Sequence, residues 1–504
     1  MQPLISAAHL KRRDVGAGAR LVKVLLISDS LGAPIHPRGI FNYSISLVEM
    51  LKAAHCGVDL VVEGSAEYGV EGGFGELEAK APQAVNAARL TEIHRYFNQS
   101  RLGFLWSFKP TKMPLLAKYR PRLLRLWIAL RERANYRPNV SVKNDPQALD
   151  FVPDKSRHLT LFDNLIVKHN FYSSSMSRAN LGLAPPWIDA SGYDLVIVDT
   201  PHFIKINGVG PDRILTILHD LIPLRDPAME SRWRHLFLRK LETTLAMGSA
   251  LVFVSRYTQT SFHFAFPNHK APREYILYPA IRRNLLSADV PLREYDIRSM
   301  FAGAAVDSGE VRGKKRKRNG ALLPPGFDAS LPYFVTATSD EPRKNISTLV
   351  RAFYGRLRGR ANLVILGEID ARRHIPAPDA NVGFPGYVSD DDKVDCFRHA
   401  QGVVFASLSE GFGIPIVEGA VLGRPVLCSD IEVFREVAGA DAFYFDPRHP
   451  ASIAGAVVAV LADPAAARER AAALHRSVIA RFSQAAVGES LRAALADLTG
   501  GVRG

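Results

Sequence analysis

Residues 407–419, SLSEGFGIPIVEG, follow the apolar run GVVFA and precede a helical pattern that begins near Pro415. A strand, a glycine-rich turn and a helix in this order are typical of a parallel α/β sheet. Glycines in such a turn let backbone N–H groups approach a ligand closely, and the start of the helix directs its positive dipole end toward an anion. Glu410 lies on the turn and Glu418 about one turn inside the helix, so the two carboxylates are placed to face different parts of one extended ligand.

An anion bound at the start of a helix, with two carboxylates that accept hydrogen bonds from hydroxyl groups, describes a nucleoside diphosphate sugar well. The alternative is an ordinary tight turn between a strand and a helix, with two solvated glutamates. A glycine-rich turn alone favours this alternative, so the assignment depends on other segments in the same half of the chain.

A second segment, TATSDEPRKN at 336–345, follows an apolar run and precedes another helical pattern. Its adjacent cations Arg343 and Lys344 are well placed to hold a diphosphate at the end of a strand. A fixed cation there stabilises the negative charge on a departing nucleoside diphosphate, and losing one such donor typically costs about 3–4 kcal/mol. A Lys344 side chain that is only solvated would contribute almost nothing.

Apolar strand patterns alternate with helical patterns in both halves of the chain. The first series starts at KVLLIS, residues 23–28, and the second at YFVTATS, residues 333–339. We therefore predict an α/β protein with two Rossmann-like domains that face each other across an interdomain cleft. The expected organisation is a tail at 1–20, an acceptor-side domain at 21–284 with an irregular basic insertion at about 70–185, a basic linker or surface excursion at 285–330, a donor-binding domain at 331–480, and a C-terminal helix at 481–504 that returns toward the first domain.

Four segments of the second half follow one another from about residue 332 to 447: EPRKN, PGYVSDDD, SLSEGFGIPIVEGAVLGRPVLCSD and FREVAG. Together they resemble the C-terminal donor domain of the large retaining glycosyltransferase family 4, which has the GT-B fold. The resemblance implies that Glu418 holds the ribose hydroxyls of a nucleotide sugar and that Glu410 contacts the sugar near its reacting carbon. It implies that Lys344 pairs with the diphosphate. The donor would also meet the backbone of four residues, Gly411, Phe412, Gly413 and Ile414.

Two places depart from the family pattern. Many members carry Gly-Arg at the end of the first strand of the donor domain, where this chain has Ala337 and Thr338. Arg343 is therefore expected to replace the missing arginine at the diphosphate. In the first half, Gly39 stands alone where the family usually has two glycines before a helix. We include Thr338 and Gly39 among the candidate donor contacts.

His219 belongs to the segment HDLIP at 219–223, which resembles a stretch found in bacterial mannosyl- and rhamnosyl-type members of the family. By that resemblance His219 reaches the donor sugar from the first domain, and it joins Glu410 and Lys344 as a candidate catalytic residue. The alternative is a histidine that is simply hydrogen-bonded at the end of a strand.

The resemblance implies transfer of a mannose-like hexose or deoxyhexose from a nucleoside diphosphate sugar to a glycan or lipid-linked glycan, as in lipopolysaccharide synthesis. The leaving phosphate takes the acceptor proton, and the configuration is retained. No cofactor is expected besides the nucleotide sugar, and no metal, because the aspartates at 390–392 follow Ser389 as the first turn of a capped helix. Two alternatives stay open: a nucleotide-sugar epimerase of the same fold, and a non-catalytic scaffold at the membrane periphery.

The net charge of +14 is concentrated in two segments. Residues 101–137 carry ten Lys or Arg against one acid, mixed with leucines and aromatic residues, and residues 312–318, RGKKRKR, carry six. The first mixture favours peripheral contact with an anionic inner-membrane surface, a hypothesis that a vesicle flotation assay tests. A solvated or packed insertion is the alternative. RGKKRKR is interpreted as a solvated loop, and nucleic-acid binding is not expected because no reader fold accompanies the charge.

Compartment is the last property that the sequence addresses. No run of eighteen apolar residues is present, and the first residues lack the pattern of a secretory signal. Three cysteines, Cys56, Cys396 and Cys428, lie far apart in apolar surroundings, which favours buried thiols in a reducing compartment. We therefore expect a cytoplasmic enzyme.

Overall fold

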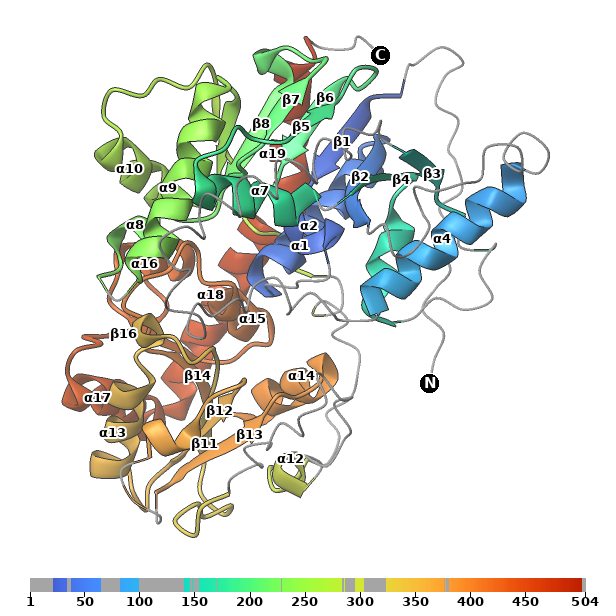
Figure 1. Ribbon diagram of the computed structural model, residues 1–504. Coiled ribbons are helices and arrows are strands. Elements are labelled where there is room, and N and C mark those ends of the chain that lie inside the picture. The colour runs from blue at the N-terminus through green and yellow to red at the C-terminus, as the bar shows by residue number, and fades with distance from the viewer. Residues whose placement is uncertain are drawn as a thin grey trace, which may run out of the picture.

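The computed structural model describes residues 21–33, 38–64, 82–98, 140–145, 147, 154–169, 171–227, 229–282, 285, 295–302, 323–375, 377 and 380–500. These residues form two α/β lobes (Figure 1). The tail at 1–20 and the basic segments 101–137 and 312–318 lie outside the described residues, so their predicted roles stay predictions.

The N-terminal lobe is built on a predominantly parallel sheet. Its strands are β1 (Lys23–Ile27), β2 (Gly57–Gly64), β3 (Val140–Lys143), β4 (Asn164–His169), β6 (Leu195–Val198), β8 (Ile214–Leu218), β9 (Ala250–Phe253) and β10 (Glu274–Ile276). They lie in the order β10-β9-β8-β6-β1-β2-β4-β3, and only β3 runs antiparallel to its neighbour. Strands β6 and β8 are buried along their whole length, and β6 is apolar throughout, because helices cover both faces of the sheet.

Short helices begin directly after several strands of this sheet. The helices of the lobe are α1 (Asp29–Gly32), α2 (Arg38–Ala53), α4 (Pro82–Asn98), η4 (Asp154–Leu161), α7 (Phe171–Leu181), η5 (Pro211–Arg213), α8 (Ile222–Arg225), α9 (Ser231–Ala246) and α10 (Arg256–Ala265). The side chains of Ser28 and Ser255 accept backbone hydrogen bonds at the starts of α1 and α10, which is the reason these helices begin there. A separate pair of strands, β5 (Trp187–Asp189) and β7 (Lys205–Asn207), lies beside the sheet.

The C-terminal lobe has a fully parallel six-stranded sheet. Its strands are β11 (Tyr333–Ala337), β12 (Asn362–Leu366), β13 (Val382–Gly386), β14 (Gly402–Phe405), β15 (Val426–Ser429) and β16 (Phe443–Phe445). Its helices are η6 (Pro342–Lys344), α13 (Ile346–Arg356), η7 (Ala371–Arg373), α14 (Asp390–His399), α15 (Ile414–Val421), α16 (Glu432–Ala438), α17 (Pro450–Ala462), α18 (Pro464–Phe482) and α19 (Gln484–Leu498), and α12 (Ser299–Ala302) packs against β13. The predicted cap of α14 is confirmed, since the Ser389 side chain accepts a hydrogen bond from the backbone of Asp392.

The prediction of an irregular insertion at about 70–185 is wrong for its last part. β4 pairs with β2 in parallel, from Leu60 with Leu165 to Gly64 with His169, and extends the main sheet. Helix α7 follows it and packs beside β2. β4 is hard to identify because its sequence, NLIVKH, has only three consecutive apolar residues. Its hydrogen bonds to β2 come from a distant part of the chain, and no local pattern reveals them.

The order of the strands places one crevice in each lobe. In the C-terminal sheet, order β13-β12-β11-β14-β15-β16, the chain moves outward from β11 on one side and then returns to start β14 on the other. The loops that leave β11 and β14 therefore diverge, and ligands of open α/β sheets bind at such a point. The same reversal occurs between β1 and β6 in the N-terminal sheet. The fold thus predicts ligand contacts after these four strands.

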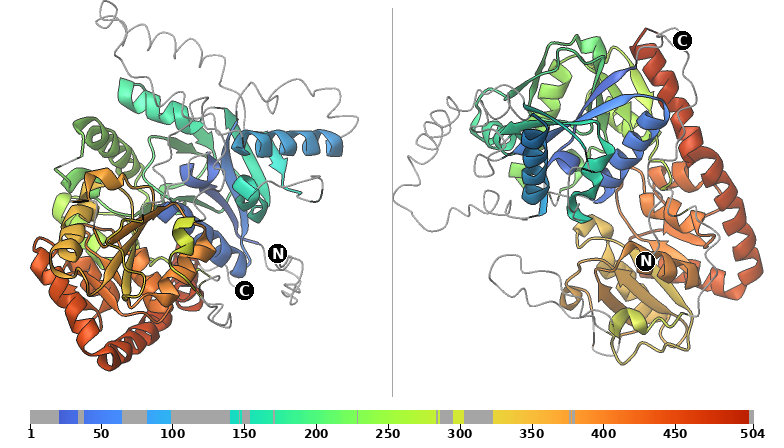
Figure 2. Two further views of the ribbon diagram at one scale, coloured as in Figure 1. Left: turned by 90° about the horizontal axis from the view of Figure 1, so that it is seen from below. Right: turned by 90° about the vertical axis from the view of Figure 1, so that its right-hand side faces the viewer.

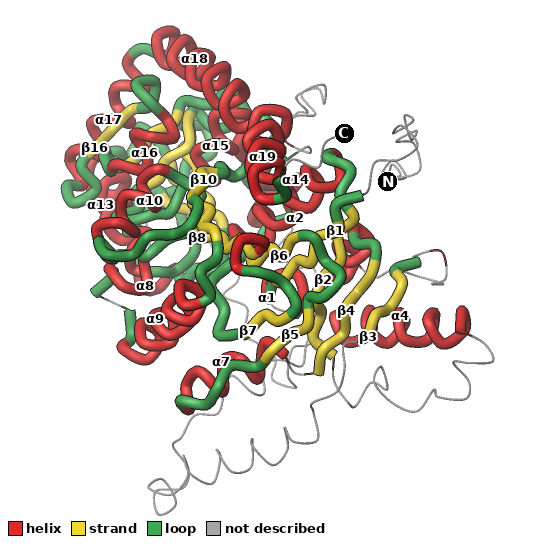
Figure 3. The backbone as a smooth tube through the Cα atoms, turned by 90° about the horizontal axis from the view of Figure 1, so that it is seen from above, coloured by secondary structure: helices red, strands yellow, loops and turns green. Residues whose placement is uncertain are grey.

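The C-terminal helices hold the two lobes together. Helices α18 and α19 run along one side of both lobes (Figure 2), and α19 packs against α2. The view from above shows α19 beside α2 and β10 (Figure 3). Gln484 donates a hydrogen bond of 2.7 Å to Glu49, and the backbone N–H of Ile281 donates one of 2.8 Å to Phe482. No single described helix is long and apolar enough to cross a membrane; α17 and the α18–α19 segment meet that test only together, across a bend of 103°.

The three cysteines are buried free thiols that form no disulfide bond, as the sequence predicts. Burial raises the pKa of Cys56 to about 11 and that of Cys396 to about 12. Burial also raises the pKa of Cys428. The thiolate is the reactive form of cysteine, so these side chains contribute packing rather than chemistry.

Glu63, near the end of β2, makes folding stability depend on pH. Its carboxylate accepts a hydrogen bond of 3.1 Å from the backbone of Ser173, yet burial raises the pKa of Glu63 to about 7. A proton binds Glu63 more tightly in the folded than in the unfolded chain. The contribution of Glu63 to folding stability is therefore complete below about pH 4.5 and disappears as the pH rises through 7. We expect Glu63→Gln to abolish a loss of up to about 3 kcal/mol between pH 5 and pH 8.

Urea unfolding at pH 5, 6, 7 and 8 measures this loss. The exposed Glu242, on α9, provides the matched control as Glu242→Gln. Parallel stability profiles for wild type and Glu63→Gln would contradict the assignment.

Candidate active site

Glu410 joins the two loops that leave β11 and β14. Its carboxylate accepts hydrogen bonds from Lys344 Nζ at 2.5 Å and from Arg343 Nη1 at 2.8 Å. Burial by itself would raise the pKa of Glu410, but the charges of Lys344 and Arg343 outweigh burial and hold that pKa below its usual value. The structure therefore brings together the acid and both cations that the sequence assigns to the sugar and diphosphate end of the donor.

The backbone around η6 orients these cations. Pro342 starts the turn, and Asn345 ends it with a left-handed φ of 57°. The Asn345 side-chain amide donates hydrogen bonds to the carbonyl oxygens of Ala406 at 3.1 Å and Pro447 at 2.7 Å. The backbone N–H of Leu408 also donates to the carbonyl of Arg343, at 2.7 Å. These bonds hold the β11 loop against the β14 loop, so Lys344 and Arg343 project toward Glu410.

The two glycines of the turn have different structural roles. Gly413 has a φ of 107° at the start of α15, a conformation that residues with a Cβ rarely adopt. Gly411 is required by the other lobe, because a Cβ there would lie 2.2 Å from the carbonyl oxygen of His219. Ser255 Oγ, from the N-terminal lobe, also donates a hydrogen bond of 2.7 Å to the carbonyl of Gly411. The sequence suggests a close ligand for both glycines, whereas Gly411 makes room for the facing lobe.

Helix α10 of the N-terminal lobe also bonds to α16 of the C-terminal lobe. The first backbone N–H groups of α10, on Arg256 and Tyr257, donate hydrogen bonds of 2.8 and 2.9 Å to the carboxylate of Glu436 on α16. A carboxylate at a helix N-terminus satisfies donors that have no partner within the helix. The two lobes are thus joined directly beside the candidate site, which sets the distance between His219 and the turn.

Glu418 forms a second acid and cation cluster farther along α15. It is buried, and it accepts hydrogen bonds of 2.9 Å from Arg282 Nη2 and from Lys393 Nζ. Arg282 also donates to Asp390 at 3.0 Å. Sequence reasoning missed Arg282 and Lys393. Lys393 directly follows the aspartates of PGYVSDDD, so the motif marked its position, but Arg282 lies in the connection between the lobes and carries no local signal.

His219 lies at the end of β8 and faces the Gly411 turn. Its Nε2 is 2.8 Å from the carbonyl oxygen of Asp199, and its ring packs edge-on against Tyr43 with centroids 4.9 Å apart. Burial lowers the pKa of His219, which favours the neutral imidazole. One ring nitrogen is therefore used inside the lobe, as the alternative interpretation has it, while the His219 backbone carbonyl lies against the Gly411 turn.

The remaining predicted contacts take different positions. Phe412 is buried, and its ring packs edge-on against Phe482 with centroids 5.2 Å apart, so its side chain stabilises the junction of the lobes. Gly39 lies in the first turn of α2 with open space around it. Thr338 follows β11, and its backbone N–H donates to Leu366 at 2.9 Å. Ile414 is the first residue of α15 and lines a pocket between the lobes.

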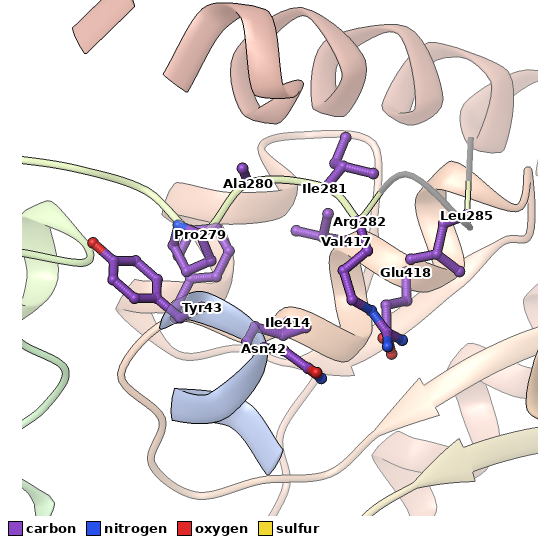
Figure 4. A pocket seen from close by; sticks show the side chains of 11 residues that line it. Asn42, Tyr43, Pro279, Ala280, Ile281, Arg282, Leu285, Ile414, Val417 and Glu418 are labelled. Atoms are coloured by element: carbon purple, nitrogen blue, oxygen red, sulfur yellow. The ribbon is translucent and has the colours of Figure 1, made fainter. Parts of the chain in front are cut away.

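This pocket encloses about 350 Å³ of empty space, part of it open to solvent. Figure 4 shows that its walls come from α2, from the connection between the lobes and from α15, with Arg282 and Glu418 close together at one end. Its lining residues are Asn42, Tyr43, Pro279, Ala280, Ile281, Arg282, Leu285, Phe412, Ile414, Val417 and Glu418. A pocket between the lobes is therefore present at the start of α15, and it is lined by Glu418 but not by Glu410, Lys344 or Arg343.

A buried polar cluster occupies the crevice of the N-terminal sheet. The carboxylate of Asp199, directly after β6, accepts hydrogen bonds through Oδ2 from Ser28, Ser30 and Ser44. Its Oδ1 has no hydrogen-bond partner among the described residues and lies 3.8 Å from His202 Nε2. Asp29, Asp199 and His202 are the described residues whose spacing suits a metal ion, with ligand atoms within 4.8 Å of one another. No motif in the sequence marks this cluster.

Two Rossmann-like lobes that meet at the crevices of their sheets define the GT-B architecture, as the sequence predicts. Solved structures confirm the fold. Anabaena Alr3699/HepE in complex with UDP-glucose superposes with a TM-score of 0.51 at 13% identity, over 94% of this chain and 99% of that one. Sucrose-phosphate synthase from Thermosynechococcus elongatus superposes with a TM-score of 0.52 at 14% identity, over 95% and 99%.

The C-terminal lobe carries a domain of a known family. The family described as glycosyl transferases group 1 matches residues 332–463. Serotype-specific mannosyltransferase WbdA of Escherichia coli is 34% identical over 139 residues, which are 26% of this chain and 17% of the relative. O-antigen chain mannosyltransferase B of Escherichia coli is 32% identical over 133 residues, 24% of this chain and 35% of the relative. The chain thus spans well under half the length of these relatives.

Proposed function

We propose that this protein is a retaining, family 4 glycosyltransferase that moves a mannose-like hexose or deoxyhexose from a nucleoside diphosphate sugar to a glycan or lipid-linked glycan. The observation that carries the proposal is the cluster of Glu410 with Lys344 and Arg343 at the point where the β11 and β14 loops diverge. Two fixed cations directly after the end of a parallel strand suit a diphosphate. Glu418, on helix α15 after the Glu410 turn, would hold the ribose.

The ion pairs of the site indicate how it would respond to the donor. A diphosphate between Lys344 and Arg343 replaces Glu410 as their anionic partner, which leaves the Glu410 carboxylate available to the sugar hydroxyls. As the bond between the anomeric carbon and the phosphate oxygen breaks, negative charge grows on the phosphate, and the two cations stabilise it. The acceptor hydroxyl forms its bond on the same face, and its proton passes to the leaving phosphate.

Relatives support the choice of sugar and process. Two of them are named O-antigen or serotype-specific mannosyltransferases of Escherichia coli, and a third, from Pseudomonas aeruginosa, is named D-rhamnosyltransferase WbpZ and is 33% identical over 109 residues. Their similarity lies in about a quarter of this chain, so a mannose-like donor and a surface-polysaccharide acceptor are part of the proposal. The proposal also places the enzyme in the cytoplasm, with residues 101–137 in contact with the inner membrane.

Donor binding without a metal is the direct test. We expect one of GDP, UDP or dTDP and its sugar to raise the melting temperature of the full chain in EDTA, because binding to the native state stabilises it. Transfer of the sugar to an acceptor should continue in EDTA at an unchanged rate. If no nucleotide shifts the melting temperature, with or without Mg²⁺ or Mn²⁺, the proposal fails. Loss of turnover in EDTA would instead point to the Asp29, Asp199 and His202 cluster.

A further inference from the structure

The carboxylate of Glu418 is already occupied by cations. Oε1 accepts hydrogen bonds of 2.9 Å from both Arg282 Nη2 and Lys393 Nζ, and Oε2 accepts one of 2.9 Å from Lys393. A carboxylate offers about four lone-pair sites, and these hydrogen bonds use three of them. A ribose that donates its 2′- and 3′-hydroxyls to the two oxygens needs two sites. The ribose therefore competes with the two cations for this carboxylate.

Arg282 is the cation that has a second carboxylate partner. Its Nη1 already donates a hydrogen bond of 3.0 Å to Asp390, whose side chain is 61% exposed. Its Nε is buried without a hydrogen-bond partner among the described residues, so the guanidinium is only partly satisfied where it stands. Lys393, in contrast, contacts both oxygens of Glu418, and its helix α14 belongs to the same lobe as α15.

Arg282 also lies in the connection between the two lobes. It ends the described part of the segment that leaves the N-terminal lobe, one residue after Ile281, whose N–H is bonded to Phe482. In Figure 4 its side chain crosses the end of the pocket and meets Glu418. The ion pair thus ties the connection between the lobes to the donor-side helix α15.

We infer that Arg282 competes with the donor ribose for Glu418 and shifts to Asp390 when a ribonucleotide binds. The inference rests on the proposed function, in which Glu418 holds the ribose. Arg282 is a positioning residue that acts through Glu418 and sets how strongly the site depends on the ribose hydroxyls. It also makes release of the lobe connection part of donor binding.

Calorimetric titration of the full chain with a nucleoside diphosphate and with its 2′,3′-dideoxy analogue tests the inference. We expect Arg282→Gln to bind the ribonucleotide about fivefold more tightly than wild type, which is the gain expected from removing one partly buried competing ion pair. The dideoxy analogue should bind both proteins equally. Arg282→Lys keeps the charge and should stay near wild type.

Arg298→Gln is the matched control, because Arg298 follows in the chain and pairs only with the exposed Asp296 among the described residues. Weaker or unchanged binding of the ribonucleotide by Arg282→Gln overturns the inference, and so does an equal gain for the dideoxy analogue. If wild type binds no nucleoside diphosphate at all, the proposed function fails first, and the inference falls with it.

Discussion

Replacing Lys344 with alanine is expected to lower turnover by about a hundredfold, and in any case by more than about tenfold. Lys344 lies on the β11 loop with its ammonium 2.5 Å from Glu410, at the point where the diphosphate would leave. The variant loses a cation whose interaction with the leaving group strengthens as charge develops on the phosphate. It also loses part of the attraction for the bound diphosphate, so the KM for the donor should rise while kcat falls.

Steady-state kinetics with saturating acceptor measures both effects. Arg373→Ala is the control, since Arg373 pairs with Asp340 in the same lobe and its side chain is 61% exposed. This control should stay within about twofold of wild type, as expected for an exposed ion pair. Equal losses in the two variants would show that general destabilisation, and not the missing ammonium, causes the effect.

Replacing Glu410 is expected to have the second large effect. The kinetic and binding signature of the Glu410 variants differs from that of Lys344→Ala. We expect Glu410→Ala and Glu410→Gln each to lower kcat by more than about tenfold, because the carboxylate no longer contacts the sugar near its reacting carbon. Binding of the nucleoside diphosphate should be unchanged or tighter. Without Glu410, Lys344 and Arg343 lose their shared counter-charge and attract the diphosphate more strongly.

The control for Glu410 is Glu341→Gln. Glu341 also pairs with Arg343, at 2.9 Å, but its side chain is 50% exposed. Lys344 pairs with Glu410 instead. Glu341→Gln should retain nearly full turnover. Weaker diphosphate binding in Glu410→Gln would mean that the carboxylate orders the cations instead of competing with the ligand. Unchanged turnover in both the Lys344 and Glu410 variants would remove the site assignment altogether.

The C-terminal lobe was largely predictable because its elements alternate regularly. Ser389 as the cap of α14, the start of α15 near Pro415 and the approach of the EPRKN loop to Glu410 all follow from local patterns at the ends of parallel strands. Parallel strands place their carboxyl ends on one edge of the sheet, so residues far apart in the chain but directly after strands meet there.

The N-terminal lobe was less predictable, for reasons that concern contacts over long distances. β4 has only three consecutive apolar residues, too few to be recognised without β2. The hydroxyls around Asp199 come from Ser28, Ser30 and Ser44, which lie 155 to 171 residues earlier in the chain. Gly411 illustrates the same limit. A local pattern reveals that a glycine is present, but only the packed lobes show that the backbone of His219 excludes a Cβ there.

Hydrophobic periodicity was therefore sufficient to predict two doubly wound domains, and the family resemblance was needed to predict the acid and the cations that the structure brings together. The packing of the lobes determined what no pattern contains: that Arg282 reaches Glu418 and that the start of α10 bonds to α16. The physical reason is that secondary structure depends on neighbours within a few residues, whereas these contacts form only when separate hydrophobic surfaces are buried against each other.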